Sequence, residues 1–206
     1  MAIAAKFRNN GQVCISPNRF YIQESKKDEF VNKFIEKTKK LKIGNGMEQD
    51  VQLGPITTLK RLGEIEELVE ITKKEGAKVL IGGKRPSGFN KGYFYEPTVF
   101  DDVDDNFTIM KTEPFGPLVP MLSFKSFDEV VERANNNDLG LCSYIYTNSM
   151  EKAHKASELM ETGCVAVNTP TVAIAEAPFG GIKQTGYGRE GGSMAVSYTH
   201  LRAHET

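Results

Sequence analysis

The feature that most constrains the fold is a regular alternation of short apolar segments with amphipathic ones in the second half of the chain. The apolar segments run from Leu118 to Phe124, from Cys142 to Thr147 and from Cys164 to Val167. Between them lie two segments with helical periodicity, 126–136 and 149–161. Strands alternating with helices at this spacing predict βαβ units and a largely parallel sheet flanked by helices. We therefore expect a layered α/β fold.

Two further helices are expected in the first half of the chain. Ser25 is a candidate N-cap for one that ends at Gly44, and the other should run from Thr58 to Glu75, with Gly76 as its stop. The residues expected to face inward are Phe30, Val31, Phe34, Ile35 and Leu41 in the first helix, and Leu62, Ile65, Val69 and Thr72 in the second.

Two more strands complete the expected sheet. One is the short segment Lys78 to Ile81, and the other is Tyr93 to Phe100, which is rich in aromatic and β-branched residues. Pro97 cannot donate a ladder hydrogen bond, so the second strand should lie at an edge or contain a bulge.

Composition excludes several classes of protein. The 206 residues include 26 Lys plus Arg and 27 Asp plus Glu, and a net charge of -1 gives no field that would attract nucleic acid or an anionic membrane. No apolar run is long enough to span a bilayer, and the first residues lack the pattern of a signal peptide. We expect a cytoplasmic protein with no nucleic-acid or membrane partner.

Three cysteines stand far apart, at positions 14, 142 and 164, without the spacing of a disulfide framework or a metal site. Cys142 and Cys164 each begin an apolar strand, so we expect both in the core. Cys14 follows the polar and flexible sequence Asn-Asn-Gly-Gln-Val. A nucleophilic thiolate needs access and nearby backbone N–H donors, which a helix start supplies, although a small buried side chain is the commoner role of a cysteine.

Two other motifs carry possible chemistry. The stretch from Gly186 to Gly191 fits the dinucleotide pattern G-x-G-x-x-G, but it follows a glycine-rich loop rather than a hydrophobic strand, so we reject it as a phosphate loop. The turn from Glu113 to Pro117 projects a carboxylate and the ring of Phe115 two residues apart. That pair suits a ligand with hydroxyl groups and a flat ring, whereas a proline-ordered loop with a solvated glutamate is the structural alternative.

Taken together, these segments resemble the aldehyde dehydrogenase superfamily from about Lys6 to Met194. The segments that carry the resemblance are FRNNGQVC at 7–14, Gly54-Pro55, YEPT at 95–98, EPFGP at 113–117, GCVAVN at 163–168, PFGGIK at 178–183, and Gly186 with Gly188-Arg189-Glu190. The resemblance implies that Cys14 is the nucleophile, that Glu113 binds the nicotinamide ribose of NAD or NADP, and that Phe115 positions the nicotinamide. It implies aldehyde oxidation through a thiohemiacetal and a thioester on Cys14.

The same resemblance implies how the chain is organised. Residues 1–182 correspond to an N-terminally truncated catalytic domain, and residues 183–206 to the remnant of an oligomerisation arm whose tail is atypical from Ser197. The family's Rossmann-type cofactor domain, general-base glutamate and oxyanion-hole asparagine would precede Met1. We therefore expect the chain alone to be inactive, and the full-length protein to be a homo-oligomer, a dimer or a tetramer.

Within the superfamily, the resemblance is nearest to succinate-semialdehyde dehydrogenases. Arg8 matches their arginine that binds the substrate carboxylate, and Ser16 stands where some members carry a second, redox-active cysteine. Their assisting serine is missing from the segment 169–177. Two alternatives stay open: a cysteine hydrolase or acyltransferase, which would require a histidine near Cys14, and a non-catalytic oligomerisation fragment.

Overall fold

A computed structural model describes residues 1–193 and 195, so the atypical tail expected from Ser197 lies outside the described residues. The chain divides into two compact units, residues 1–126 and residues 127–206. The expected boundary between residues 182 and 183 stays a prediction.

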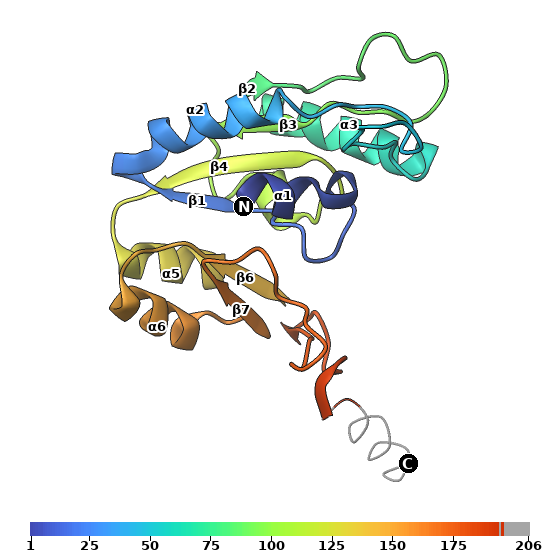
Figure 1. The fold of residues 1–206 in the computed structure, drawn as a ribbon. Coiled ribbons are helices and arrows are strands. Elements are labelled where there is room, and N and C mark those ends of the chain that lie inside the picture. Colours follow the sequence, from blue (N-terminus) through green and yellow to red (C-terminus); the bar gives the residue numbers. More distant parts are fainter. Residues whose placement is uncertain (194, 196–206) are drawn as a thin grey trace. The chain divides into compact units, whose positions relative to one another are not determined.

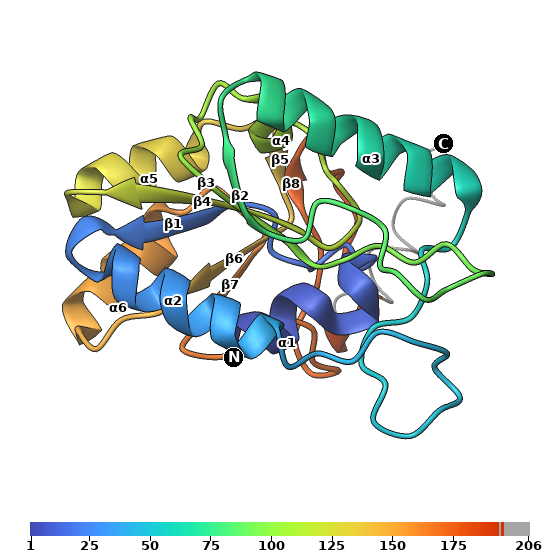
Figure 2. The same cartoon turned by 90° about the horizontal axis from the view of Figure 1, so that it is seen from above.

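The first unit is built on a four-stranded mixed sheet (Figures 1 and 2). Its strands are β1 (Phe20–Gln23), β2 (Lys78–Ile81), β3 (Thr98–Asp101) and β4 (Leu118–Phe124). They lie in the order β1-β4-β3-β2, and β4 pairs in parallel with both of its neighbours. Only the β2–β3 pairing is antiparallel, so the α/β class and the mainly parallel pairing are confirmed for this sheet.

Helices cover both faces of this sheet. They are α1 (Ala2–Phe7) and α2 (Lys27–Thr38), with the 3-10 turns η1 (Arg8–Gly11) and η2 (Glu24–Lys26), and α3 (Leu59–Lys74) and α4 (Thr108–Lys111). Figure 2 shows α3 on one side of the strands and α1 with α2 on the other. In β4, Val119 and Met121 pack with the apolar cluster of α1 and α2, whereas Leu118 and Leu122 pack with that of α3 and α4. This alternation is the period-two pattern of a strand buried on both faces.

The two helices expected in this half differ in how well the sequence predicts them. Thr58 caps α3 by accepting a hydrogen bond from the N–H of Arg61, and the expected inner face is buried, as predicted. The other prediction was too long: α2 begins at Lys27 rather than next to Ser25 and ends at Thr38. Single backbone bonds turn the chain at Lys40 and Leu41 directly after it, which ends the helix before Gly44.

The strand expected at Tyr93–Phe100 is also corrected. Only Thr98–Asp101 forms β3, and Pro97 lies just before it, where no ladder bond is lost. β3 lies between β4 and β2, so it is not an edge strand. The irregularity in register lies instead on β2, between Val79 and Ile81.

The second unit contains a parallel βαβ unit, as predicted. Its elements are α5 (Phe127–Asn135), β5 (Leu139–Gly140), β6 (Cys142–Ile145), α6 (Met150–Leu159), β7 (Cys164–Val167) and β8 (Ile182–Lys183). β6 pairs in parallel with β7, and α6 connects the two strands. β5 pairs in antiparallel with β8. Ser149 caps α6 by accepting from the N–H of Lys152. The expectation that Cys142 and Cys164 lie in the core is corrected, because both are half-buried. Each is the first residue of its strand, and a sheet of two short strands does not bury the residues at its ends.

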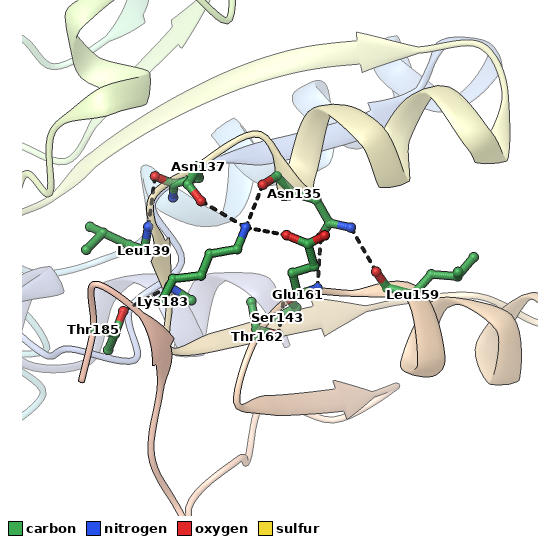
Figure 3. A network of polar contacts seen from close by, with 10 residues as sticks. Asn135, Asn137, Leu139, Ser143, Leu159, Glu161, Thr162, Lys183 and Thr185 are labelled. Carbon is green, nitrogen blue, oxygen red and sulfur yellow. Dashed lines mark hydrogen bonds and ion pairs between the residues drawn. The ribbon is translucent and has the colours of Figure 1, made fainter. Parts of the chain in front are cut away.

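Lys183 ties four segments of this unit together (Figure 3). Its Nζ donates to the carbonyl oxygens of Asn135 at 2.8 Å and Asn137 at 3.0 Å, and it lies 2.5 Å from the carboxylate of Glu161. The Asn135 side chain bonds the carbonyl of Leu159 and the N–H of Glu161. This lysine of the glycine-rich segment therefore holds β8 against the ends of α5 and α6.

Among the residues that the structure describes, no helix is long and apolar enough to cross a membrane.

Candidate active site

Cys14 lies on an exposed turn that follows α1 and η1. The turn closes through a 2.9 Å hydrogen bond from the N–H of Ser16 to the carbonyl of Val13. The buried Ser16 hydroxyl donates to the carbonyl oxygen of Lys6 at 3.0 Å, which ties the turn back to α1. The expectation of a helix start next to the thiol is corrected: the helix ends before Cys14, and a hydrogen-bonded turn presents the thiol to solvent.

The segment leading to Cys14 has an unusual backbone. Asn9, Asn10 and Gly11 have φ values of 48°, 58° and 75°, so three consecutive residues adopt the left-handed conformation. Asn and Gly are the residues that accept this conformation at least cost, which explains the Asn-Asn-Gly sequence. Backbone of this kind persists only when surrounding contacts hold it in place.

Gln12 supplies those contacts. Its buried side-chain carbonyl accepts from the backbone N–H of Thr57 at 2.9 Å and from the Thr57 hydroxyl at 3.1 Å. Its amide nitrogen donates to the carbonyls of Asn9 at 3.2 Å and Pro55 at 3.3 Å, and the Asn10 amide donates to Gly54 at 3.0 Å. The Gly54-Pro55 segment therefore supports the loop of residues 9–14 that leads to Cys14, a role that the sequence did not reveal.

The turn that carries Glu113 and Phe115 packs directly on the loop of residues 9–14. A Cβ added at Gly11 would lie 2.2 Å from the carbonyl oxygen of Gly116. Such a contact is impossible for any side chain, so the two backbones can touch only because residue 11 is glycine. Cys14 lies three residues after this contact, and Phe115 directly precedes it in the other segment. The structure thus brings two of the predicted segments, about 100 residues apart in the sequence, into contact.

Glu113 is exposed, and its carboxylate makes no hydrogen bond or ion pair with the described residues, so its oxygens are available to a ligand. Phe115 is half-buried and has a φ of 41°, a left-handed value that is rare outside glycine and asparagine. The carbonyl of Pro117 accepts from the N–H of Thr98 at 2.8 Å, which fixes the end of the turn to β3. The turn therefore presents a carboxylate and a ring from a rigid support.

Comparisons with known proteins decide the family. The model of the aldehyde dehydrogenase family matches residues 1–203. The chain is 42% identical to a probable NADP(+) succinate-semialdehyde dehydrogenase of Sinorhizobium fredii over 92% of its own length, and 44% identical to aldehyde dehydrogenase 1A1 of Bos taurus over 95%. The structure of an aldehyde dehydrogenase from Bacillus cereus in complex with NAD+ superimposes with a TM-score of 0.92, at 38% identity, over 96% of this chain and 40% of that chain. The chain belongs to the aldehyde dehydrogenase family.

The chain spans about two fifths of the curated aldehyde dehydrogenases that it matches, 38% of the Sinorhizobium protein and 39% of the bovine one. The resemblance to succinate-semialdehyde dehydrogenases is confirmed, since the similar Sinorhizobium protein is described as a probable member of that group.

Lys6 is a buried lysine close to the Cys14 turn, and the sequence analysis missed it. Its side chain is fully buried in α1, and its Nζ has no hydrogen-bond partner among the described residues. Burial lowers the pKa of Lys6 from 10.5 to about 7, while the negative charge of Glu113 acts in the opposite direction. The only sequence signal was a lysine inside the otherwise apolar stretch AIAAKF.

Arg8 lies on the surface directly after α1, as the first residue of η1. Its side chain makes no hydrogen bond or ion pair with the described residues, so Arg8 neither bonds a backbone carbonyl nor pairs with an acid among them. Residues 8–14 do not form a continuous helix, because Asn9 and Asn10 are left-handed. The distance between guanidinium and thiol is therefore set by the loop and not by helical turns.

The glycine pattern at 186–191 lies within a loop that closes on itself. Phe179 and Glu190 exchange two backbone hydrogen bonds, of 2.6 and 2.7 Å. The Arg189 guanidinium donates to the carbonyls of Gly181, at 2.7 Å, and Gly188, at 2.9 Å. These bonds give the loop a structural role, and its rejection as a phosphate loop stays a prediction.

Proposed function

We propose that this chain supplies the nucleophile and part of the cofactor site of an NAD(P)-dependent aldehyde dehydrogenase. The observation that carries the proposal is the exposed Cys14, which the Gly11–Gly116 contact holds beside the turn of Glu113 and Phe115. An accessible thiol on a braced loop meets the requirement for covalent catalysis on a carbonyl carbon.

The chemistry on Cys14 begins with attack of its thiolate on the aldehyde carbon, which gives a tetrahedral thiohemiacetal. The developing oxyanion needs hydrogen-bond donors, and the proposed donor from this chain is the backbone N–H of Cys14. Loss of hydride from the thiohemiacetal leaves a thioester on Cys14. Water then hydrolyses the thioester to the carboxylic acid and regenerates the thiol.

NAD or NADP, when bound, accepts the hydride. Glu113 fits the hydroxyl groups of a nicotinamide ribose because its carboxylate is exposed and makes no bonds to the described residues. The half-buried Phe115 fits the role of a ring that limits the position of the nicotinamide, and such positioning matters because hydride transfer tolerates little error in distance. The relatives' names include NADP(+) and a neighbouring structure holds NAD+, so we propose either cofactor.

The proposed substrate is a short aldehyde with a distal carboxylate, with succinate semialdehyde as the best candidate. The support is the exposed Arg8 side chain, six residues before the thiol, with no partner among the described residues. A guanidinium binds a carboxylate through two parallel hydrogen bonds. The relatives include the probable succinate-semialdehyde dehydrogenase at 42% identity, but also aldehyde dehydrogenase 1A1 at 44%, so identity alone does not select the substrate.

The rival hydrolase or acyltransferase has less support. A cysteine hydrolase requires a histidine to activate its thiol, and the first unit, residues 1–126, contains none. His154 is exposed on α6, where it lies 3.3 Å from Glu158. A non-catalytic role for the chain by itself is compatible with the proposal, and we expect the 206-residue chain alone neither to bind NAD at micromolar concentrations nor to oxidise aldehydes.

The substrate proposal is tested in a chimaera, in which this chain replaces the matching segment of the Bacillus cereus aldehyde dehydrogenase. Both succinate semialdehyde and butanal are assayed with NAD. Arg8→Leu should lower kcat/KM for succinate semialdehyde by tens- to hundreds-fold, which is about 2 to 4 kcal/mol of transition-state stabilisation. Activity on butanal should change little, because butanal has no carboxylate.

Arg8→Lys is the matched control for charge, since lysine keeps the charge but not the two parallel bonds. It should recover only part of the lost activity on succinate semialdehyde. Equal losses on both aldehydes would assign Arg8 a structural role and remove the support for a carboxylate-bearing substrate.

We also propose that the enzyme acts as a homo-oligomer, a dimer or a tetramer. Light scattering on the purified chimaera measures its mass directly, and a monomeric mass would contradict the proposal.

A further inference from the structure

Cys142 and Cys164 are direct partners in the parallel pairing of β6 with β7. Register partners on adjacent parallel strands project their side chains to the same face of the sheet. Strands lie about 4.8 Å apart, which falls within the Cα separation that a disulfide bridges. The two cysteines are 22 residues apart in the sequence and are neighbours in the fold, on the adjacent strands β6 and β7 that Figure 1 labels.

Both cysteines are half-buried, so a small oxidant can reach them. The Cys164 thiol is covered on one side by the glycine-rich loop: its Sγ lies 3.7 Å from the carbonyl oxygen of Gly180 and 4.0 Å from that of Pro178. A Cβ added at Gly163 would lie 1.9 Å from the Gly180 carbonyl oxygen, so this loop packs tightly on the start of β7. The pair thus lies beside a loop whose position depends on close backbone contacts.

We propose that Cys142 and Cys164 are a redox pair that forms a reversible disulfide across β6 and β7. With hydrogen peroxide as the oxidant, one thiolate attacks the peroxide and becomes a sulfenic acid while water leaves. The second thiolate then attacks that sulfur and expels hydroxide, which takes up a proton, so that two thiols and one peroxide give one disulfide and two waters. The two sulfurs are oxidised and the peroxide is reduced. In the disulfide, Cys164 no longer carries the S–H that faces the carbonyl oxygens of Pro178 and Gly180.

The proposal is independent of aldehyde oxidation, and it is tested on the folded chain carrying Cys14→Ser, which removes the exposed competing thiol. Peroxide treatment, alkylation of the remaining thiols and proteolysis without reductant should yield one peptide pair that joins Cys142 to Cys164. The pair should disappear on addition of dithiothreitol. Because the fold holds the thiols together, the bond should form at least about tenfold faster in buffer than in urea.

A matched control moves one thiol to the opposite face of the same strand. Cys142→Ser combined with Ser143→Cys keeps two cysteines at nearly the same sequence separation, and circular dichroism verifies that the variant is folded. No bond to Cys164 should form in it under the same treatment. Oxidation of Cys142 or Cys164 to sulfinic acid without a bond between them, equal rates with and without urea, or equal bond formation in the control would each overturn the proposal.

Discussion

Replacing Lys6 by methionine is predicted to stabilise the chain, and most strongly at low pH. The Lys6 ammonium is fully buried without a hydrogen-bond partner among the described residues, and burial lowers its pKa from 10.5 to about 7. A pKa change of this size corresponds to about 5 kcal/mol against the folded, charged form. That is large beside the 5 to 15 kcal/mol that typically separates folded from unfolded domains.

The pH dependence follows from the direction of the pKa change. Between pH 7 and pH 10.5 the unfolded chain holds a proton on Lys6 that the folded chain has lost, so the stability of the wild type rises with pH in this window. Methionine has no charge, so Lys6→Met lacks this rise. The variant's advantage should be about 5 kcal/mol larger below pH 7 than at pH 10.5. By pH 10.5 it should shrink to about 1 to 3 kcal/mol, the cost of an unbonded neutral amine.

Urea unfolding followed by circular dichroism, at pH 6, 8 and 10, measures this difference. Lys37→Met, at an exposed position of α2, is the matched control and should change stability by no more than about 0.5 kcal/mol. An advantage of Lys6→Met that is the same at pH 6 and pH 10, or a loss of stability at pH 6, would refute the reasoning.

Three further predictions concern contacts that hold the Cys14 loop and the second unit in place. Gly11→Ala places a Cβ 2.2 Å from the Gly116 carbonyl oxygen at a φ of 75°, so it should lower the free energy of unfolding in urea by at least about 2 kcal/mol. Gly63→Ala, in open space on α3, is the control and should raise it by about 0.5 to 1 kcal/mol. Gln12→Ala removes the acceptor of the Thr57 N–H and should cost about 1 to 3 kcal/mol; a neutral effect would show that water replaces the side chain. Lys183→Met leaves the carbonyls of Asn135 and Asn137 without their donor and should lower the free energy of unfolding by at least about 1 kcal/mol. The control Lys152→Met, at an exposed position of α6, should cause no measurable change.

The elements that the sequence predicts well are those whose signals are local. The bounds of β2, β4 and β7 follow from short apolar runs, and α3 begins where Thr58 caps it. Local patterns also predict the parallel pairing of β6 and β7, because a strand, a helix and a strand at short spacing have few other arrangements.

The parts that the sequence predicts poorly depend on contacts between distant residues. The chain before Cys14 is not helical because Gln12 forms hydrogen bonds with Pro55 and Thr57, which lie 43 and 45 positions away in the sequence. No local sequence pattern contains that information. The Gly11–Gly116 contact and the burial of Lys6 likewise require the fold. The assignment of Cys14, Glu113 and Phe115 rests on motifs that resemble a family, and the structure adds how the segments that carry them are held together.

The central claim, that Cys14 is the nucleophile, is tested most directly by comparing three cysteine variants in the chimaera with the Bacillus cereus enzyme. NADH formation is followed with saturating aldehyde for Cys14→Ala, Cys142→Ala and Cys164→Ala, after circular dichroism has shown that all three are folded. Cys14→Ala should lose at least about a thousandfold in kcat, because no other group forms the thioester. Under reducing conditions the other two variants should stay within about threefold of the parent chimaera, since neither thiol takes part in that step. Substantial turnover by Cys14→Ala, or a comparable loss in Cys142→Ala or Cys164→Ala, would contradict the assignment.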